Sequence, residues 1–342
     1  MAIKLLVFDY RNNEKDFFRS HELENFDITF FVESLNEETV KNLDEEILNS
    51  TAVISVFVNS EVTENVINSF KNLRIISTRS TGIDHINKLA AEAKNIAIVN
   101  VEGYGARSVA QYTVGLMLAL VRHIIPASEY IKNTSVTCKS FVGRDISKFT
   151  LGVVGTGSIG AAVCKLAISM GMKVLAYDIV GRKDLTEKYG VQYVDFNTLL
   201  KESDVISIHI PYTGENKNMF AFEQFSIMKN TAYLINTSRG EIVNIKDIYY
   251  AITKGVIKGA ALDVVMCEYY SFNKCSNKNH VLYADFDCVG EAQILKELTQ
   301  NPEVIVTPHI AYETQDAIDY ILEVTFIAIS DIVKGGNVYK AN

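Results

Sequence analysis

The stretch LGVVGTGSIG, residues 151–160, decides the fold of this chain. Its first four residues form a short apolar run that predicts a buried strand, and the pattern IGAAVCKLAISMG that follows predicts a helix. Gly155, Gly157 and Gly160 lie between them in the order G-x-G-x-x-G. The next apolar run, KVLAY, predicts a second strand. A strand, a glycine-rich turn, a helix and another strand in this order predict a unit of two parallel strands joined by a crossover helix.

The three glycines and the acid that follows them indicate a dinucleotide site. Gly155 permits the tight turn, Gly157 lets the backbone approach a pyrophosphate, and Gly160 allows close packing of helix on strand. Asp178, at the end of the second strand, can accept hydrogen bonds from the ribose hydroxyls and repels a 2′-phosphate, which favours NAD. Arg182 is close enough in the sequence to leave NADP as the minority alternative. The residues expected to contact NAD here are Gly155, Thr156, Gly157, Ser158, Ile159, Gly160, Asp178 and Ile179.

Strand and helix patterns alternate on both sides of this unit. The strand candidates are IKLLVF, ITFFV, AVISVF, LRIIST and IAIVNV before it, and VISIHI, TAYLINT, AALDVV and VIVTP after it. EETVKNLDEEIL and TENVINSFKNL have helical spacing, and later helices are expected to begin near Asn197, Asn244 and Glu291. This alternation indicates parallel sheets covered on both faces. Because 342 residues fit two domains of ordinary size, we predict two doubly wound α/β domains.

Composition and charge exclude several classes of protein. The chain is 48% hydrophobic and 22% charged, as is typical of a globular protein, and no apolar run reaches the roughly 18 residues of a membrane span. The N-terminal MAIKLLVFDY predicts a strand and not a signal peptide. A net charge of −8 argues against a nucleic-acid surface. We therefore expect a cytoplasmic protein that binds neither membrane nor nucleic acid. The nearly apolar stretch 109–124 predicts a buried helix at a domain junction.

The cysteines are odd in number and form no C-x-x-C pair. Cys267, Cys275 and Cys288 lie in one loop-like region with His280 and Asp287, which leaves a metal site as the minority alternative. Their spacing matches no familiar zinc pattern. The preferred interpretation is that the cysteines are free thiols in a reducing compartment, and that the chain binds no metal.

Three later strands end in residues that suit hydride chemistry on a 2-oxo acid. TAYLINTSRGE ends near Arg239, GAALDVVMCE brings Asp263 and Glu268, and VIVTPH ends in His309. A guanidinium can hold a carboxylate in a two-pronged geometry, and a histidine can give a proton to a carbonyl oxygen. A carboxylate beside the imidazole favours its charged form. Each residue alone is more often a surface charge or a structural strand end, but together, after a dinucleotide motif, they predict a catalytic set.

With these motifs the chain resembles the D-2-hydroxyacid dehydrogenase family along nearly its full length, and within it the D-lactate dehydrogenase branch, including the vancomycin-resistance type. The matching stretches are STRSTGIDHI, VVGTGSIG, KVLAYD, SIHIPYT, LINTSRGEIVN, GAALDV and TPHIAY. The resemblance implies a Rossmann dinucleotide-binding domain, 103–310, inserted into a flavodoxin-like substrate domain formed by 1–102 and 311–342. It also implies that the domains close over a cleft, and that the chain forms a homodimer with the 109–124 helix at the interface.

The same resemblance implies a role for individual residues. Arg239 matches the substrate clamp, His309 the acid–base residue, Glu268 its carboxylate partner, and Asp263 a residue near the nicotinamide. Further positions are implied for substrate, at Thr81, Gly82, Tyr104 and Tyr312, and for the cofactor, at Pro211 and Thr237. The chain departs from the family pattern at Gly105, Ala106 and Gln111 and at Glu313, which stands where the family commonly has an aromatic residue.

The leading hypothesis is an NAD-dependent oxidoreductase that interconverts a small 2-oxo acid, pyruvate in the first place, and its D-2-hydroxy acid. The alternatives are enzymes of the 2-hydroxyisocaproate, phenyllactate, glycerate or phosphoglycerate type, and a non-catalytic NAD-sensing corepressor. Formate dehydrogenases pair their histidine with glutamine, so Glu268 argues against that class. The Y-x-x-x-K pattern of short-chain dehydrogenases occurs at Tyr250/Lys254 and Tyr270/Lys274, but with 17 tyrosines chance matches are expected.

Overall fold

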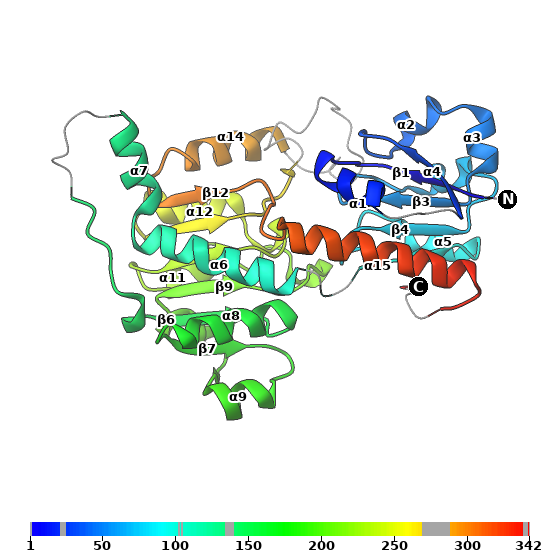
Figure 1. Ribbon diagram of the computed structural model, residues 1–342. Helices are drawn as coiled ribbons and strands as arrows, with labels where there is room; N and C mark the ends of the chain where they lie inside the picture. Colours follow the sequence, from blue (N-terminus) through cyan, green and yellow to red (C-terminus); the bar gives the residue numbers. More distant parts are fainter. Residues whose placement is uncertain are drawn as a thin grey trace. The chain divides into compact units, whose positions relative to one another are not determined.

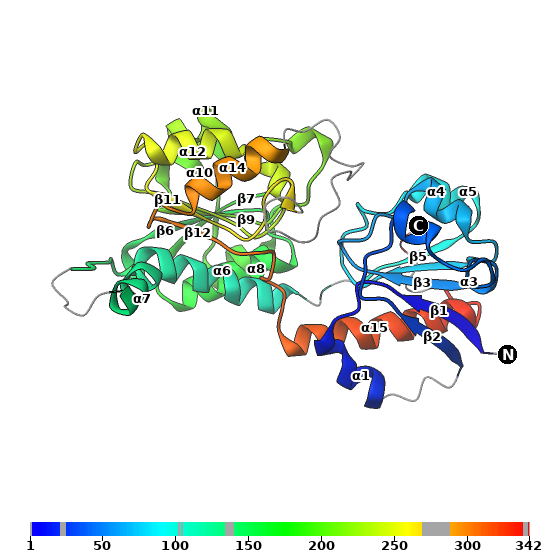
Figure 2. The same ribbon diagram turned by 90° about the horizontal axis from the view of Figure 1, so that it is seen from above.

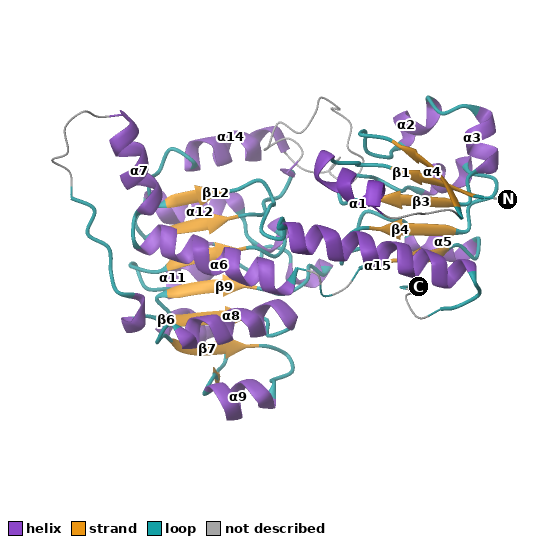
Figure 3. Ribbon diagram, in the orientation of Figure 1, coloured by secondary structure: helices purple, strands orange, loops and turns teal. Residues whose placement is uncertain are grey.

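The computed structural model describes residues 2–20, 25–101, 103, 105–133, 140–268, 288–337 and 341. The chain divides into two compact units, one formed by Met1–Tyr104 with Glu313–Asn342, the other by Gly105–Tyr312. Each unit contains one sheet of parallel strands with helices on both faces (Figure 1; Figure 3). The prediction of two doubly wound parallel-sheet domains is confirmed.

The first unit has five strands in the order β2-β1-β3-β4-β5. This is the flavodoxin-like order, in which the first crossover turns one way and the later ones the other. The strands follow the predicted apolar runs and are β1 (Ile3–Val7), β2 (Phe26–Phe30), β3 (Val53–Val56), β4 (Ile75–Thr78) and β5 (Ala97–Val99).

Helices from both ends of the chain cover the first sheet. On one face α4 (Glu64–Ser69) and α5 (Lys88–Ala93) pack against the strands, with Val66, Ile67 and Ala91 buried (Figure 2). On the other face lie α1 (Lys15–Ser20) and the last helix, α15 (Gln315–Val333), whose Leu322 and Phe326 join Leu5 and Val7 in the core. The end of the chain therefore completes the domain that its beginning started.

The predicted helix over EETVKNLDEEIL is two helices, α2 (Glu37–Lys41) and α3 (Glu45–Ser50). Asp44 has extended backbone angles and begins the second helix, so the pattern continues across a break in the backbone. Hydrophobic spacing alone does not reveal such a break, because both helices turn their apolar side chains toward the same core.

The second unit has seven strands in the order β12-β11-β10-β9-β6-β7-β8. This is the order of a Rossmann sheet with one additional strand, β12, and the crossover point lies between β6 and β9. The strands are β6 (Thr150–Val154), β7 (Lys173–Tyr177), β8 (Gln192–Tyr193), β9 (Val205–Ile208), β10 (Tyr233–Asn236), β11 (Gly259–Leu262) and β12 (Val304–Val306). Of these described strands only β8, two residues long, is not predicted by the sequence.

Two layers of helices enclose this sheet (Figure 2). One layer contains α6 (Ala106–Val121) and α8 (Ser158–Ser169), which pack against each other. The other contains α10 (Phe196–Glu202), α11 (Phe222–Ile227), α12 (Ile245–Thr253) and α14 (Cys288–Leu298). Two further helices, α7 (Ile124–Asn133) and α9 (Lys183–Tyr189), belong to the same unit.

The apolar helix predicted over 109–124 is α6, which is buried within its own unit. It begins directly after the boundary between the units, and Val114, Met117 and Leu120 belong to the core around β6. The helix ends at Val121 and not at residue 124, because His123 has a φ of 52° and turns the chain into α7. No single described helix is long and apolar enough to cross a membrane; α6 and α7 reach that length and composition only together, across a bend of 63°.

One histidine of the second unit, His209, is partly exposed as a residue but has a buried ring nitrogen. His209 follows β9, and its Nε2 lies 2.8 Å from Ser207 Oγ, while Nδ1 has no hydrogen-bond partner among the described residues. Burial lowers the pKa of His209 to about 3. The ring therefore stays neutral in the folded protein down to about pH 3. In the unfolded chain the same histidine has a pKa near 6.5 and binds a proton already in mild acid.

We expect this histidine to make the second unit less stable in mild acid. Between pH 6.5 and about 3 the unfolded state binds one more proton at His209 than the folded state does, so the free energy of unfolding falls as the pH falls. In His209→Gln, which keeps a polar atom near Ser207 but cannot titrate, urea unfolding from pH 7 to pH 5 should depend less on pH than in the wild type. Equal pH dependence in the two proteins would contradict this assignment.

Candidate active site

The sequence-predicted site residues of the second unit lie along the edge of its sheet that is formed by the carboxyl ends of the strands. Because all strands run in the same direction, their carboxyl ends meet at this edge. Arg239 follows β10, Asp263 follows β11 and His309 follows β12, and these three strands are neighbours. The glycine-rich turn follows β6, two strands further along the same edge.

A buried carboxylate organises the turn that carries His309. Asp263 is fully buried, and its side chain accepts hydrogen bonds from Thr307 Oγ1 at 2.6 Å, from the Ile310 amide at 3.0 Å and from the Ala311 amide at 2.9 Å. The His309 amide donates to the Asp263 carbonyl at 2.8 Å. With its amide and the next two satisfied in this way, His309 is held at a φ of 55°, which an L-residue rarely adopts. Asp263 therefore acts on the backbone of the His309 turn.

His309 and Glu268 form the histidine–carboxylate pair that the sequence predicts. His309 Nδ1 lies 2.9 Å from Glu268 Oε2, and both side chains are about one quarter exposed. With Nδ1 directed at the carboxylate, the ring proton on that side is held, and Nε2 is the nitrogen that can exchange a proton with a bound molecule. The ring of Tyr312 stands edge-on to the imidazole, with 6.5 Å between the ring centroids.

Arg239 lies on a loop that packs tightly against the chain before Glu268. It precedes a short 3-10 helix, Gly240–Ile242, and its carbonyl accepts a hydrogen bond from Asn236 Nδ2 at 2.9 Å. A Cβ on Gly240 would lie 2.0 Å from the Val265 carbonyl carbon, so only glycine allows this approach. The R-G pair thus brings the loop of the guanidinium against the segment that carries the carboxylate.

The glycine-rich turn fits a pyrophosphate. Gly155 has a φ of 91°, and a Cβ on Gly160 would lie 1.9 Å from the Gly155 carbonyl oxygen, so both glycines are required by the fold itself. A Cβ on Gly157 would meet no described atom within 4 Å, so this glycine leaves open space where an anion can approach. The start of α8 has no side-chain cap, which leaves its first amides for that anion.

Asp178 is fixed beside the turn and is charged. Its carboxylate accepts hydrogen bonds from the amide and, at 2.8 Å, the hydroxyl of Thr156. Burial raises the pKa of Asp178, but the hydrogen bonds from Thr156 and from the Val180 amide outweigh it and hold the pKa below its ordinary value. Arg182 pairs with Asp184 through two hydrogen bonds of 3.0 Å. A charged Asp178 and an engaged Arg182 both disfavour a 2′-phosphate.

The other predicted positions are placed as follows. Ile179 is 95% exposed beside Asp178, Pro211 is exposed, and Thr237 is buried with its hydroxyl 2.9 Å from that of Thr113. In the first unit, Thr81 Oγ1 donates to the Val101 carbonyl at 2.9 Å, and Gly82 is the next residue of that turn. Tyr104 lies outside the described residues. Thr81 and Gly82 belong to the first unit, and the remaining described residues belong to the second.

Sequence reasoning missed a buried arginine in the first unit. Arg79, after β4, is 1% exposed, pairs with Glu14 at 3.3 Å and donates to the Phe8 carbonyl at 2.7 Å. It directly precedes the turn of Thr81 and so ties that turn to the end of β1. The signal in the sequence was a charged residue inside the strand pattern LRIISTRS, since a buried charge needs partners. Glu313, which the sequence left unexplained, forms an ion pair with Arg11 at 3.5 Å.

The prediction of free thiols is wrong for two cysteines. Cys267 and Cys288 form a disulfide with a Cα–Cα distance of 5.5 Å. Cys164 is a buried free thiol in α8, and burial raises its pKa to about 12. Among the described residues no group of histidines, cysteines and acids could hold a metal ion, whereas Cys275, His280 and Asp287 lie outside them.

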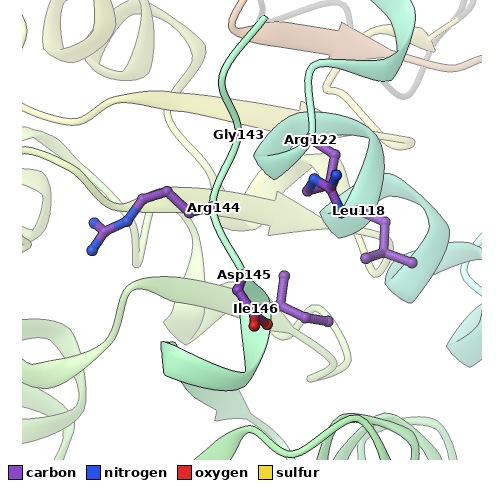
Figure 4. Close-up of a pocket in the computed structure, with 6 residues that line it drawn as sticks. All are labelled: Leu118, Arg122, Gly143, Arg144, Asp145 and Ile146. Carbon is purple, nitrogen blue, oxygen red and sulfur yellow. The ribbon is translucent and has the colours of Figure 1, made fainter.

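One pocket of about 420 Å³ lies away from these residues. It is lined by Leu118 and Arg122 at the end of α6 and by residues 143–146, which lead into β6 from its amino end. The side chain of Arg144 points away from Arg122, so the two guanidiniums do not converge on one point (Figure 4). We assign no function to this pocket.

Comparison with known proteins identifies relatives of this chain. Residues 114–311 match the family described as D-isomer specific 2-hydroxyacid dehydrogenase, NAD binding domain. A glycerate dehydrogenase of Methylorubrum extorquens is 34% identical over 74% of this chain and 73% of its own length. A D-specific alpha-keto acid dehydrogenase of Enterococcus faecium is 35% identical over 80% of each chain. A crystal structure of D-lactate dehydrogenase from Aquifex aeolicus, complexed with NAD and lactic acid, is 34% identical, with a TM-score of 0.84 over 97% of this chain and 96% of that one.

The glycines separate cofactor binding from folding. Gly157→Ala should leave thermal stability unchanged but weaken NADH binding about tenfold or more, because the new methyl group lies where amide–phosphate hydrogen bonds form. Gly160→Ala should lower thermal stability itself, since its methyl group overlaps the Gly155 carbonyl. The control is Gly115→Ala in α6, where an added Cβ also meets no described atom within 4 Å.

These three variants are compared by thermal unfolding and by NADH fluorescence titration. Gly115→Ala should match the wild type in NADH affinity. Unchanged NADH affinity in Gly157→Ala would show that the anion does not approach this glycine.

Proposed function

The chain belongs to the D-isomer specific 2-hydroxyacid dehydrogenase family and is an NAD-dependent oxidoreductase, and on that basis we propose that it reduces pyruvate to D-lactate with NADH, reversibly. His309 is the general acid and base of this reaction, Glu268 is its carboxylate partner, and Arg239 holds the substrate. The observation that carries the proposal is the 2.9 Å contact between His309 Nδ1 and Glu268 Oε2 at the edge of the nucleotide-binding sheet.

The histidine pair supplies the proton that the reaction needs. NADH, when bound, supplies the hydride to the carbonyl carbon, so the carbonyl oxygen must gain a proton as it becomes a hydroxyl. Glu268 holds Nδ1 of the ring and stabilises the positive charge of the protonated form. Nε2 then gives its proton to the substrate oxygen, and in the reverse direction it takes the proton of the hydroxyl.

Arg239 and the buried Asp263 complete the set. A guanidinium can bind both oxygens of the substrate carboxylate and so set the angle at which the carbonyl meets the hydride donor. Asp263 holds the His309 turn through its three hydrogen bonds. The same proposal places Asp263 near the nicotinamide of the bound cofactor. Tyr312 stands beside the ring of His309.

Pyruvate is proposed as substrate because of the D-lactate branch that the motifs resemble. The structure of the Aquifex aeolicus relative, which contains lactic acid, extends over nearly the whole of this chain. A glycerate dehydrogenase and a D-specific alpha-keto acid dehydrogenase are also relatives, so a longer or hydroxylated 2-oxo acid is the second candidate. A homodimer is proposed on the same resemblance.

We expect His309→Gln to lower kcat for pyruvate reduction about 100-fold or more, because general acid catalysis is lost while NADH binding is kept. His123→Gln is the matched control. His123 also has a left-handed φ, 52°, and its Nδ1 lies 4.0 Å from Glu303 Oε2, but Glu303 precedes β12 and so lies at the opposite edge of the sheet. Steady-state rates compare both variants with the wild type.

The control variant should retain wild-type turnover. If His309→Gln stays within about tenfold of the wild type, at most ~1.4 kcal/mol of barrier is lost and the assignment of the acid fails.

An initial-rate panel tests the substrate. We expect kcat/KM with NADH to be highest for pyruvate among pyruvate, 2-oxobutyrate, phenylpyruvate, hydroxypyruvate and oxaloacetate, and lower with NADPH because Asp178 is charged beside the ribose position. A preference for hydroxypyruvate would move the proposal to the glycerate type. NADH binding without turnover of any 2-oxo acid would instead indicate the corepressor class.

A further inference from the structure

The carboxylate of the proposed active site directly follows a disulfide-bonded residue. Cys267 precedes Glu268 in the chain, and its partner Cys288 is the first residue of α14. Cys267 is fully buried and Cys288 is 5% exposed, and with Met266 they form a small apolar cluster of their own. The bond therefore lies in the interior of the second unit, one residue from the group that holds His309.

From these contacts we propose that the Cys267–Cys288 disulfide is a covalent positioning element that keeps Glu268 against His309 and makes turnover sensitive to thiol reduction. The inference rests on the proposed role of Glu268 as the partner of the acid–base histidine.

The backbone next to Glu268 has a conformation that needs support. Cys267 has a φ of 58°, in the left-handed region that residues with a side chain rarely adopt. His309, on the other side of the pair, has a φ of 55° and is supported by Asp263 through hydrogen bonds. On the Glu268 side, the disulfide supplies a comparable constraint, because it is attached to Cys267, the residue whose backbone conformation is unfavourable. Both halves of the pair are thus held in left-handed turns by a contact within one or two residues.

The other end of the disulfide is anchored in the core. α14 begins at Cys288, and its Leu295 and Leu298 are buried in the hydrophobic cluster that includes Ile248 and Ile252 of α12. A bond from Cys267 to this helix connects the Glu268 segment to a rigid element. On the preceding side, the close approach of Gly240 to Val265 restrains the same segment. Glu268 is therefore restrained from both directions only while the disulfide is intact.

Reduction of the Cys267–Cys288 disulfide by an external dithiol removes one of these restraints. The S–S bond breaks, two thiols form, and the two electrons and two protons come from the dithiol, which closes to its own disulfide. Burial of both sulfurs slows attack by an external thiolate. The reduced enzyme keeps its cofactor turn, which lies at β6 and is not connected to either cysteine.

The test compares oxidised and dithiothreitol-reduced wild-type enzyme, with the state of Cys267 and Cys288 followed by alkylation and mass spectrometry. Reduction should lower kcat about tenfold, because Glu268 is no longer held against His309, and should change the Kd of NADH less than about twofold. Reoxidation should restore kcat. Cys267→Ser and Cys288→Ser should each have the kcat of the reduced enzyme and no response to dithiothreitol, whereas Cys164→Ala should respond as the wild type does.

A second comparison shows whether the bond acts through Glu268. In Glu268→Gln, which has lost the carboxylate, reduction should change the remaining kcat less than about twofold, because the positioned group is already absent. An equal tenfold loss in Glu268→Gln, a loss of NADH binding on reduction, or a wild-type kcat that does not respond to complete reduction overturns the inference. If the oxidised wild type turns over no 2-oxo acid although it binds NADH, the proposed function itself fails.

Discussion

The hydrogen bonds of the buried Asp263 are the constraint on which the site depends. They join the end of β11 to the turn after β12 and hold His309 in a left-handed conformation that its own backbone disfavours. In that conformation Nδ1 of the ring meets Glu268, so the second nitrogen is left to exchange a proton. A carboxylate buried at a strand end thus holds in place the histidine that we propose as the acid–base group. The parallel sheet then places the loop of Arg239 and the glycine-rich turn along the same edge.

Most of the fold could be predicted because buried parallel strands are continuous apolar runs. Every described strand except β8 follows such a run, and β8 was missed because two residues give no pattern. The break between α2 and α3 and the end of α6 at Val121 depend on the backbone angles of Asp44 and His123. Hydrophobic spacing does not record backbone angles, and helix boundaries are its least certain product.

The candidate site was predictable to the extent that it follows from topology. Residues at the ends of neighbouring parallel strands meet, so the amino-acid sequence alone is enough to group Arg239, Asp263 and His309. The pairing of Cys267 with Cys288 could not be predicted, because a sequence separation of 21 does not indicate that two cysteines meet, and the compartment argument favoured free thiols. Arg79 was overlooked because an arginine in a strand pattern is usually exposed. Its partners, at the end of β1 and just before α1, are far from it in the sequence.

The central claim is that this edge of the sheet delivers hydride and proton to one face of a 2-oxo acid. Chiral analysis of the product formed from pyruvate and NADH tests it most directly, because the geometry of carboxylate clamp, histidine and cofactor determines which face is attacked. The account predicts that one D-lactate forms for each NADH oxidised. L-lactate, a racemic product, or oxidation of NADH without a 2-hydroxy acid would contradict it.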